Sequence, residues 1–294
     1  MTSDTEIDPD ETTADTEPTG SAPEDLDLGG VVARSRAGSS FSLDDHDPRD
    51  TFGWDKEAAK ARVLSEIAVV AELQKLLFAE RKQALLVVLQ AMDAAGKDGV
   101  LRTVLTGLNP AGVHVTSFGV PSEEELAHDF LWRVHRQTPA KGQIGVFNRS
   151  HYEDVLVVRV KGLAPAKVWK KRYDHIAAFE RTLVDDGTAV VKLYLNVSNE
   201  KQRERLQDRV DSPDERWKFR RGDLEDRKLW PDYMAAYTEA IRRTDADHAP
   251  WYVVPADRKW VRNLVVARIL RHELEQLDPK FPPPEPGIAG TIVE

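Results

Sequence analysis

The chain has 294 residues and 41% hydrophobic content, enough to bury a full core in one large domain or two small ones. No apolar run approaches the roughly 18 residues of a membrane span, and the absence of cysteine excludes disulfides, cysteine-ligated iron–sulfur clusters and a thiol nucleophile. The start of the chain lacks the basic and apolar segments of a signal peptide. We therefore expect a cytoplasmic protein that does not associate with membranes.

The formal net charge of −9 comes from the N-terminal segment. Residues 1–33 hold ten acids and no base, and removing these acids leaves a formal charge of +1 for the remainder. A nearly neutral body suits polyanion binding better than the total charge suggests. Residues 1–45 are rich in Asp, Glu, Thr, Pro and Gly and poor in apolar side chains, so we predict a disordered acidic tail.

A strand, a small-residue turn and a helix follow a long amphipathic helix predicted over residues 55–82. The strand is the apolar run 85–90, and the apolar positions of residues 100–108 recur at helical spacing. The turn between them carries Gly96 and Lys97. This context is typical of a phosphate-binding loop, in which small residues let backbone amides approach the anion and a lysine adds charge. The expected phosphate contacts are Ala94, Ala95, Gly96, Lys97, Asp98 and Gly99.

The match to the phosphate-loop pattern is imperfect. Ala91 stands at the first glycine and Asp98 at the magnesium-binding hydroxyl, and an ordinary turn with an exposed lysine is the alternative. Asp93 favours the functional interpretation. An acid inside a phosphate-binding turn would repel its ligand unless a divalent cation lay between them, so Asp93 is predicted to position metal or phosphate.

The next elements bring polar side chains to the end of a third strand. Residues 112–119 predict the second strand, and a helix is expected from Pro121 to about Arg136. Residues 143–147 predict the third strand, which is followed by residues 148–154. Ligands bind at the carboxyl ends of parallel strands, so Arg149 is expected to bind phosphate, and Glu153 and Asp154 to bind magnesium near Asp93, directly or through water. A solvated helix start is the alternative.

The remaining elements complete an α/β domain. We predict helices over residues 165–186, 233–244 and 260–277, strands over 189–197 and 251–255, and a helix after Ser198 that carries Arg209. Residues 211–230 interleave bases with aromatics, which suits a mobile cover over an anionic substrate; their acids disfavour a nucleic-acid-binding arm. The prediction is a parallel five-stranded sheet covered on both faces, spanning residues 52–278, with a helical lid at about 208–240 and a loose tail at 279–294.

Four blocks of sequence, in order, resemble the type 2 polyphosphate kinases, a family of P-loop kinases. They are Gln90–Gly99, Val146–Leu156, the lid residues Trp217-Lys218-Phe219, Asp223-Leu224 and Arg227, and Ala249-Pro250-Trp251 with Pro255–Trp260. The resemblance covers residues 52–277. It implies a P-loop kinase-like, three-layer α/β/α fold. It also implies reversible phosphoryl transfer between inorganic polyphosphate and a nucleotide, with Mg²⁺, or alternatively Mn²⁺, and no covalent enzyme intermediate.

The resemblance also implies roles for single residues. Asp93 corresponds to the acid that positions metal and accepting phosphate, Lys97 to the loop lysine, and Arg149 and Arg209 to arginines that reach the transferred group. Lys218, Asp223 and Arg227 correspond to lid positions. Many members have an aspartate where Asn148 stands, which makes Glu153 the expected substitute metal ligand and leaves Asn148 as an expected phosphate- or nucleotide-binding residue. This branch resembles members that phosphorylate AMP and ADP.

The implied partners are polyphosphate and an adenine or guanine nucleotide, with no nucleic acid, in a homodimer or homotetramer. Three other functions remain open from the sequence: an ATP-dependent nucleoside monophosphate kinase, a non-catalytic nucleotide-binding protein and a nucleic-acid-binding module. Assays with AMP or ADP and polyphosphate, and with AMP and ATP, would distinguish the first. Tolerance of a neutralised Asp93 would indicate the second, and salt-dependent retention on DNA the third.

Overall fold

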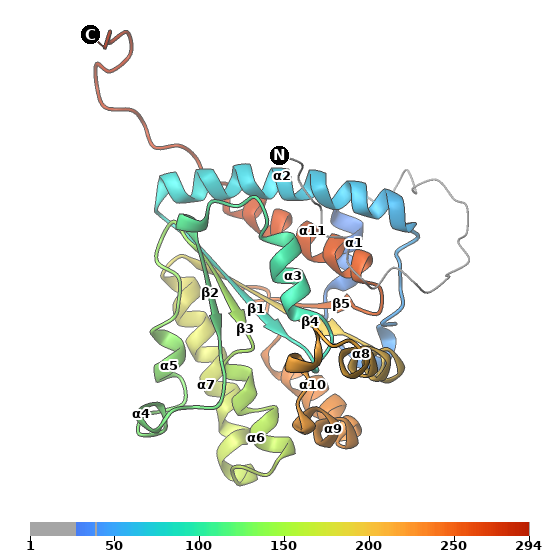
Figure 1. Cartoon of the computed structure of the whole chain (residues 1–294). Coiled ribbons are helices and arrows are strands. Elements are labelled where there is room, and N and C mark those ends of the chain that lie inside the picture. The colour runs from blue at the N-terminus through green and yellow to red at the C-terminus, as the bar shows by residue number, and fades with distance from the viewer. Residues whose placement is uncertain (1–27, 39, 294) are drawn as a thin grey trace.

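The computed structural model describes residues 28–38 and 40–293, and within them five parallel strands form one sheet (Figure 1). The strand order is β2-β3-β1-β4-β5. The strands are β1 (Ala84–Gln90), β2 (Val113–Ser117), β3 (Ile144–Asn148), β4 (Thr188–Asn196) and β5 (Trp251–Pro255). The predicted parallel five-stranded sheet is confirmed, and the predicted strand ends differ from the observed ones by two residues at most.

The central strands are apolar because helices cover both faces of the sheet. All seven residues of β1 are buried, whereas β2 at the sheet edge has a mixture of exposed and half-buried residues. One face is covered by α2 (Lys56–Glu80), α3 (Lys97–Val104) and α11 (Lys259–Leu277), and the other by α7 (Ala166–Asp185) and α10 (Trp230–Thr244) (Figure 1). The short helix α6 (Val157–Val160) lies beside α7 and α10. The predicted three-layer α/β/α architecture is confirmed.

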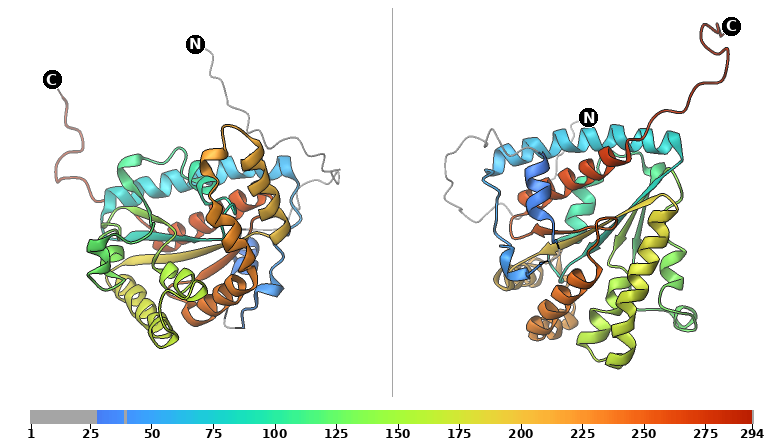
Figure 2. Two further views of the ribbon diagram at one scale, coloured as in Figure 1. Left: turned by 60° about the horizontal axis from the view of Figure 1, so that its bottom comes forward. Right: turned by 180° about the vertical axis from the view of Figure 1, so that it is seen from behind.

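The carboxyl ends of the strands carry the loops and short helices of greatest interest. The turn after β1 leads into α3, and η3 (His151–Asp154) follows β3. The helices α8 (Asn199–Asp211), η4 (Arg216–Lys218) and α9 (Arg221–Lys228) lie between β4 and α10 in the chain (Figure 2). The lid predicted at about 208–240 corresponds to the end of α8, to η4 and α9, and to the first part of α10. That this segment moves stays a prediction.

The prediction of a disordered tail over residues 1–45 is wrong for its last part. Residues 28–35 form the helix α1 (Leu28–Ser35), which lies beside α11, and η1 (Leu43–Asp45) follows (Figure 2). Val31 and Phe41 are buried, and Arg36 pairs with Asp245. Few apolar residues suffice here because they dock on a surface that the rest of the chain provides. The first 27 residues of the predicted tail lie outside the described residues.

Phe41 should therefore contribute to stability although it lies in a polar segment. Its side chain is 2% exposed, and truncation of a buried phenylalanine leaves a cavity, so Phe41→Ala should lower the free energy of unfolding by about 3 kcal/mol or more. Urea denaturation measures this change. The control is Phe281→Ala at a 59% exposed position, which should change it by less than about 0.5 kcal/mol. If Phe41→Ala and Phe281→Ala lowered the free energy of unfolding by equally small amounts, Phe41 would not be part of the core.

The single helix predicted from Pro121 to Arg136 is also wrong. The structure has two short helices, α4 (Glu123–Leu126) and α5 (Trp132–His135). The backbone N–H of Leu131 donates to the Asp129 carboxylate at 3.0 Å, a local turn that competes with helix continuation. Residues 279–293 contain neither helix nor strand and extend from the body (Figure 1). In the part of the chain described, no helix has the length and apolar character to cross a membrane.

Candidate active site

The turn after β1 has the backbone geometry of a close-approach loop. Ala94 adopts a positive φ of 61°, and Gly96, at the N-cap of α3, has a φ of 101°. A Cβ atom at Gly96 would lie 1.8 Å from Nη1 of Arg262. Only glycine fits there, because the φ angle and the packed arginine both exclude a side chain.

Side chains donate hydrogen bonds to the backbone carbonyl groups of this loop. Nζ of Lys97 donates to the carbonyl oxygen of Ala91 at 2.9 Å and to that of Met92 at 3.4 Å. Gln202 donates to the Asp93 carbonyl at 3.0 Å, and Arg205 donates to those of Ala94 and Ala95, each at 3.1 Å. The five successive carbonyls of residues 91–95 are thus paired with side-chain donors. The first-turn amides of α3 have no intrahelical acceptor and provide a positive end for an anion.

Arg149 lies opposite the loop, between two carboxylates. Its Nη2 atom is 2.5 Å from Oδ1 of Asp93, and its Nη1 atom is 4.0 Å from Oε2 of Glu153. Its backbone N–H donates to the Leu89 carbonyl at 3.1 Å, which ties the end of β3 to β1. Arg149 has a φ of 63°, a strained angle for a side-chain-bearing residue. Such strain is characteristic of functional sites, where surrounding contacts impose it.

The charges in this cluster shift one another's pKa values. Burial by itself would raise the pKa of Asp93, but Lys97, Arg149 and Arg209 outweigh it and lower the pKa. Burial raises the pKa of Glu153, although Arg149 and Lys97 oppose the change. Burial also lowers the pKa of Lys97, against the opposing effect of Asp93. The two carboxylates therefore have pKa values shifted in opposite directions, which is common at active sites.

Asn148 and Asp98 pair with each other at the edge of the cluster. Nδ2 of Asn148 donates to Oδ1 of Asp98 at 3.1 Å, whereas the buried Oδ1 of Asn148 has no hydrogen-bond partner among the described residues. An orphaned amide oxygen and carboxylates such as Asp93 and Glu153 are hard oxygen donors of the kind that suit Mg²⁺ and its bound waters. In the described chain, no group of three or more His, Asp or Glu side chains could hold an ion unaided. Magnesium commonly needs only one or two carboxylates when substrate phosphates complete its coordination.

The predicted lid residues divide into two groups. Asp223 is buried, and burial followed by the charge of Asp93 raises its pKa, so it shares the electrostatic environment of the loop, as Arg209 does. Lys218 instead pairs with Glu215 at 2.5 Å. Arg227 donates to the Asn199 backbone and side chain and to the Gln202 side chain. Lys218 and Arg227 therefore contact other protein groups and not the side chains of Asp93, Lys97, Arg149 and Glu153, which we call the Asp93 cluster.

The sequence interpretation missed Gln202, Arg205 and Arg262. Arg205 is buried and also donates to the carbonyls of Ala256 and Asp257 after β5. Gln202, Arg205 and Arg209 are spaced three and four residues apart, which places them on one face of a helix. That spacing could have identified the first two. No pattern in the sequence pointed to Arg262.

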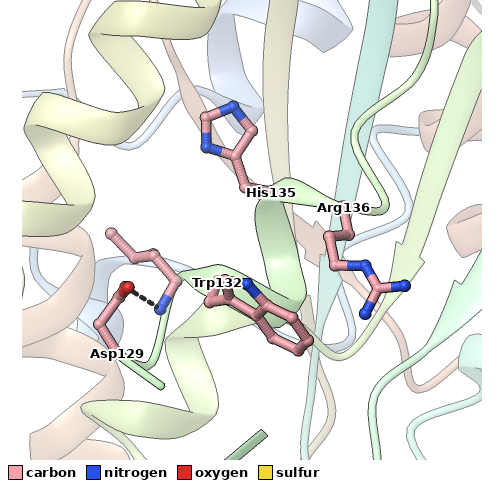
Figure 3. Close-up of a pocket in the computed structure, with 5 residues that line it drawn as sticks. Asp129, Trp132, His135 and Arg136 are labelled. Atoms are coloured by element: carbon pink, nitrogen blue, oxygen red, sulfur yellow. Dashed lines mark hydrogen bonds between the residues drawn. The ribbon is translucent and has the colours of Figure 1, made fainter.

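A separate hollow lies around α5, away from the predicted site residues. Asp129, Leu131, Trp132, His135 and Arg136 line a cavity of about 350 Å³ (Figure 3). The Arg136 guanidinium lies 4.7 Å from the centroid of the Trp132 ring. This hollow contains none of the side chains of the Asp93 cluster, so its chemistry is distinct from that of the loop.

Comparison with known proteins gives consistent results. A family model described as Polyphosphate kinase 2 matches residues 53–282. The chain is 54% identical over 258 residues to an AMP/ADP-polyphosphate phosphotransferase of Meiothermus ruber, covering 86% of this chain and 96% of that protein. It is 43% identical over 257 residues to an ADP-polyphosphate phosphotransferase of Rhodopseudomonas palustris, covering 83% and 89%. The crystal structure of Polyphosphate Kinase 2 from Arthrobacter aurescens superposes with a TM-score of 0.83 at 45% identity, covering 85% of this chain and 91% of that one.

Proposed function

Because the chain belongs to the polyphosphate kinase 2 family, we propose that it transfers phosphoryl groups reversibly between inorganic polyphosphate and AMP or ADP. The observation that carries this proposal is that Asp93, Lys97 and Arg149 lie together at a loop whose carbonyls at residues 91–95 accept hydrogen bonds from side chains. Such a loop can bind a chain of phosphates through its amides. The named activities of the two relatives support AMP and ADP as acceptors.

In the proposed mechanism the protein aligns the reactants and neutralises charge. Phosphoryl transfer passes through a loose transition state in which charge is spread over the equatorial oxygens. Lys97 and the loop amides hold the terminal phosphates of polyphosphate. Arg149 and Arg209 stabilise charge on the group in transfer, and Asp93 keeps Arg149 oriented. The nucleotide phosphate is already ionised at neutral pH, so no general base is needed.

We propose Mg²⁺ as the metal, with Mn²⁺ as an alternative. Asp93 and Glu153 would hold it, with the Asn148 amide oxygen accepting from a coordinated water. A bound ion would supply Lewis-acid stabilisation of the phosphate charge at these carboxylates. The remaining predicted contacts, Lys218, Asp223 and Arg227, would act after the lid closes over the substrates. A homodimer or homotetramer and the absence of nucleic-acid binding stay predictions.

One set of assays tests the proposal. The full chain is incubated with polyphosphate and AMP, polyphosphate and ADP, and ATP and AMP, each with and without Mg²⁺, and new nucleotides are separated by chromatography. We expect ADP and ATP from the polyphosphate reactions only when magnesium is present. Parallel reactions with GMP and GDP measure purine preference. Turnover of ATP with AMP, but none with polyphosphate, would instead identify an ATP-dependent monophosphate kinase.

Glu153→Gln should separate stability from activity. The raised pKa of Glu153 means that its ionised form is disfavoured in the folded protein, and this cost is present above the ordinary glutamate pKa and disappears in acid. The variant should therefore unfold at an equal or higher temperature at pH 7.5, and the difference should shrink as the pH falls. Its transfer rate should nevertheless fall by about tenfold or more if Glu153 helps to hold magnesium.

Thermal unfolding across pH and initial rates across magnesium concentration measure these two effects. Glu57→Gln is the control, because its side chain is 75% exposed on α2, and it should change neither. A Glu153→Gln protein with full activity at low magnesium would remove Glu153 from the proposed metal site.

A further inference from the structure

Gln202 lies between the helix α9 and the phosphate loop. Its side chain is 1% exposed. Its Nε2 atom donates to the Asp93 carbonyl at 3.0 Å, and its Oε1 atom accepts from Nη1 of Arg227, also at 3.0 Å. One amide group therefore contacts both a residue of α9 and the backbone of the acid in the loop.

The chemistry of its two neighbours requires an amide at this position. A guanidinium group can only donate hydrogen bonds, and a carbonyl oxygen can only accept them. The residue between them must accept at one end and donate at the other, as glutamine does. Glutamate would keep the acceptor for Arg227 but lose the donor for Asp93, and methionine would lose both. The same constraint fixes the orientation of the amide.

The contact continues from Gln202 in both directions. On α9, Asp226 precedes Arg227 and pairs at 2.6 Å with Lys161, which directly follows α6, so two neighbouring residues attach this helix to different parts of the body. On the loop, the peptide held by Gln202 belongs to Asp93, whose carboxylate contacts Arg149 at 2.5 Å. A displacement of α9 would remove Arg227, the donor to Oε1 of Gln202. The Gln202 side chain would then be less well fixed in its hydrogen bond to the Asp93 carbonyl.

We propose that Gln202 is a positioning residue that couples the docking of α9 to the conformation of the phosphate loop. With α9 docked, Arg227 fixes the amide of Gln202, and the amide fixes the Asp93 peptide and the direction of its carboxylate. With α9 displaced, the loop loses this restraint. Its kinetic consequences rest on the proposed function, whereas the coupling itself can be measured without substrate.

Amide hydrogen exchange of the full chain measures the coupling directly. Arg227→Ala, which removes the contacts of α9 with Asn199 and Gln202 of α8, should raise exchange in residues 91–99 severalfold, and Gln202→Met should raise it by a similar factor. The double variant should show no further increase, because both changes break the same connection. The matched control is Gln207→Met on the same helix, where the exposed side chain bonds only Asp211 at 2.9 Å among the described residues. It should leave exchange in the loop unchanged.

Gln202→Glu gives a directional test and replaces Gln202→Met if that variant does not fold. Glutamate retains an acceptor for Arg227, so exchange in α9 (residues 221–228) should not rise, while exchange in the loop should. In the transfer assay we expect kcat to fall by about tenfold or more with KM for polyphosphate and nucleotide within about threefold, because the loop binds phosphate but presents Asp93 poorly.

Three results would overturn the coupling. The first is unchanged exchange of residues 91–99 in Arg227→Ala. The second is an increase in exchange in the double variant that equals the sum of the two single increases. The third is parent-like exchange of residues 91–99 in Gln202→Glu. The unmodified chain is assayed alongside. Absence of polyphosphate transfer by that chain would refute the proposed function, and the exchange measurements would still decide whether Gln202 couples the two elements.

Discussion

Replacement of Lys97 with alanine should lower the transfer rate by at least about a hundredfold, the usual cost of removing one preorganised group that stabilises transition-state charge. Nζ of Lys97 is bonded to two loop carbonyls, so its charge is fixed beside the position expected for the transferred phosphates. The effect should appear mainly in kcat. Initial rates at saturating polyphosphate and nucleotide measure it.

The fold should survive this substitution. Loss of Nζ leaves the carbonyls of Ala91 and Met92 without that donor, which costs about 1–3 kcal/mol of stability. Thermal unfolding should therefore stay cooperative with a modestly lower midpoint. Lys82→Ala is the control, because that lysine is 76% exposed and pairs with Glu80, and both rate and midpoint should match the parent. Normal turnover of folded Lys97→Ala would contradict the assignment of this lysine.

Asp93→Asn should have an effect of similar size for a different reason. The amide keeps the shape of the side chain but removes the charge that faces Lys97 and Arg149 and that is proposed to hold magnesium. We expect at least about a hundredfold loss of rate. The concentration of magnesium needed for half-maximal rate should also rise. A magnesium titration of initial rates measures both changes.

The stability of this variant should depend on pH in the opposite sense to Glu153→Gln. The pKa of Asp93 is lowered in the folded protein, so its ionised form stabilises the fold above the ordinary aspartate pKa, and this contribution is lost as the pH falls through the folded pKa. Asp93→Asn should unfold at a lower temperature than the parent at pH 7.5, and the two should converge in acid. Asp174→Asn, at a side chain 78% exposed, should change neither property. If the initial rate of Asp93→Asn equalled that of the parent at every magnesium concentration, Asp93 would be excluded as a metal ligand.

The parts of the fold that were predicted correctly depend on local patterns. The apolar run of β1, the Gly96-Lys97 turn and the helical spacing after it are all encoded within about 25 consecutive residues. The end of β3 could be placed opposite this turn because parallel strands bring their carboxyl ends to one edge. Asp93, Arg149 and Glu153 were therefore predicted as neighbours, and the structure brings them together.

The errors have physical causes that lie outside such patterns. Residues 28–45 look disordered by composition, yet Val31 and Phe41 are buried because other elements supply the apolar surface. The helix expected up to Arg136 is interrupted where the Asp129 side chain bonds the backbone. Arg227 is expected to be a lid residue only from the resemblance, and its contacts with Asn199 and Gln202 could not be predicted from the sequence.

The sequence by itself determined the order of the five strands and of the long helices between them, the turn after β1 and its acidic and basic residues, because each depends on residue type and short spacing. The tertiary structure decided how the loop is held. Gln202, Arg205 and Arg262 reach its backbone from helices more than 100 residues away in the chain. Every residue has a backbone carbonyl, so the sequence does not show which carbonyls accept hydrogen bonds from distant side chains. Only the folded structure shows which donors position the site.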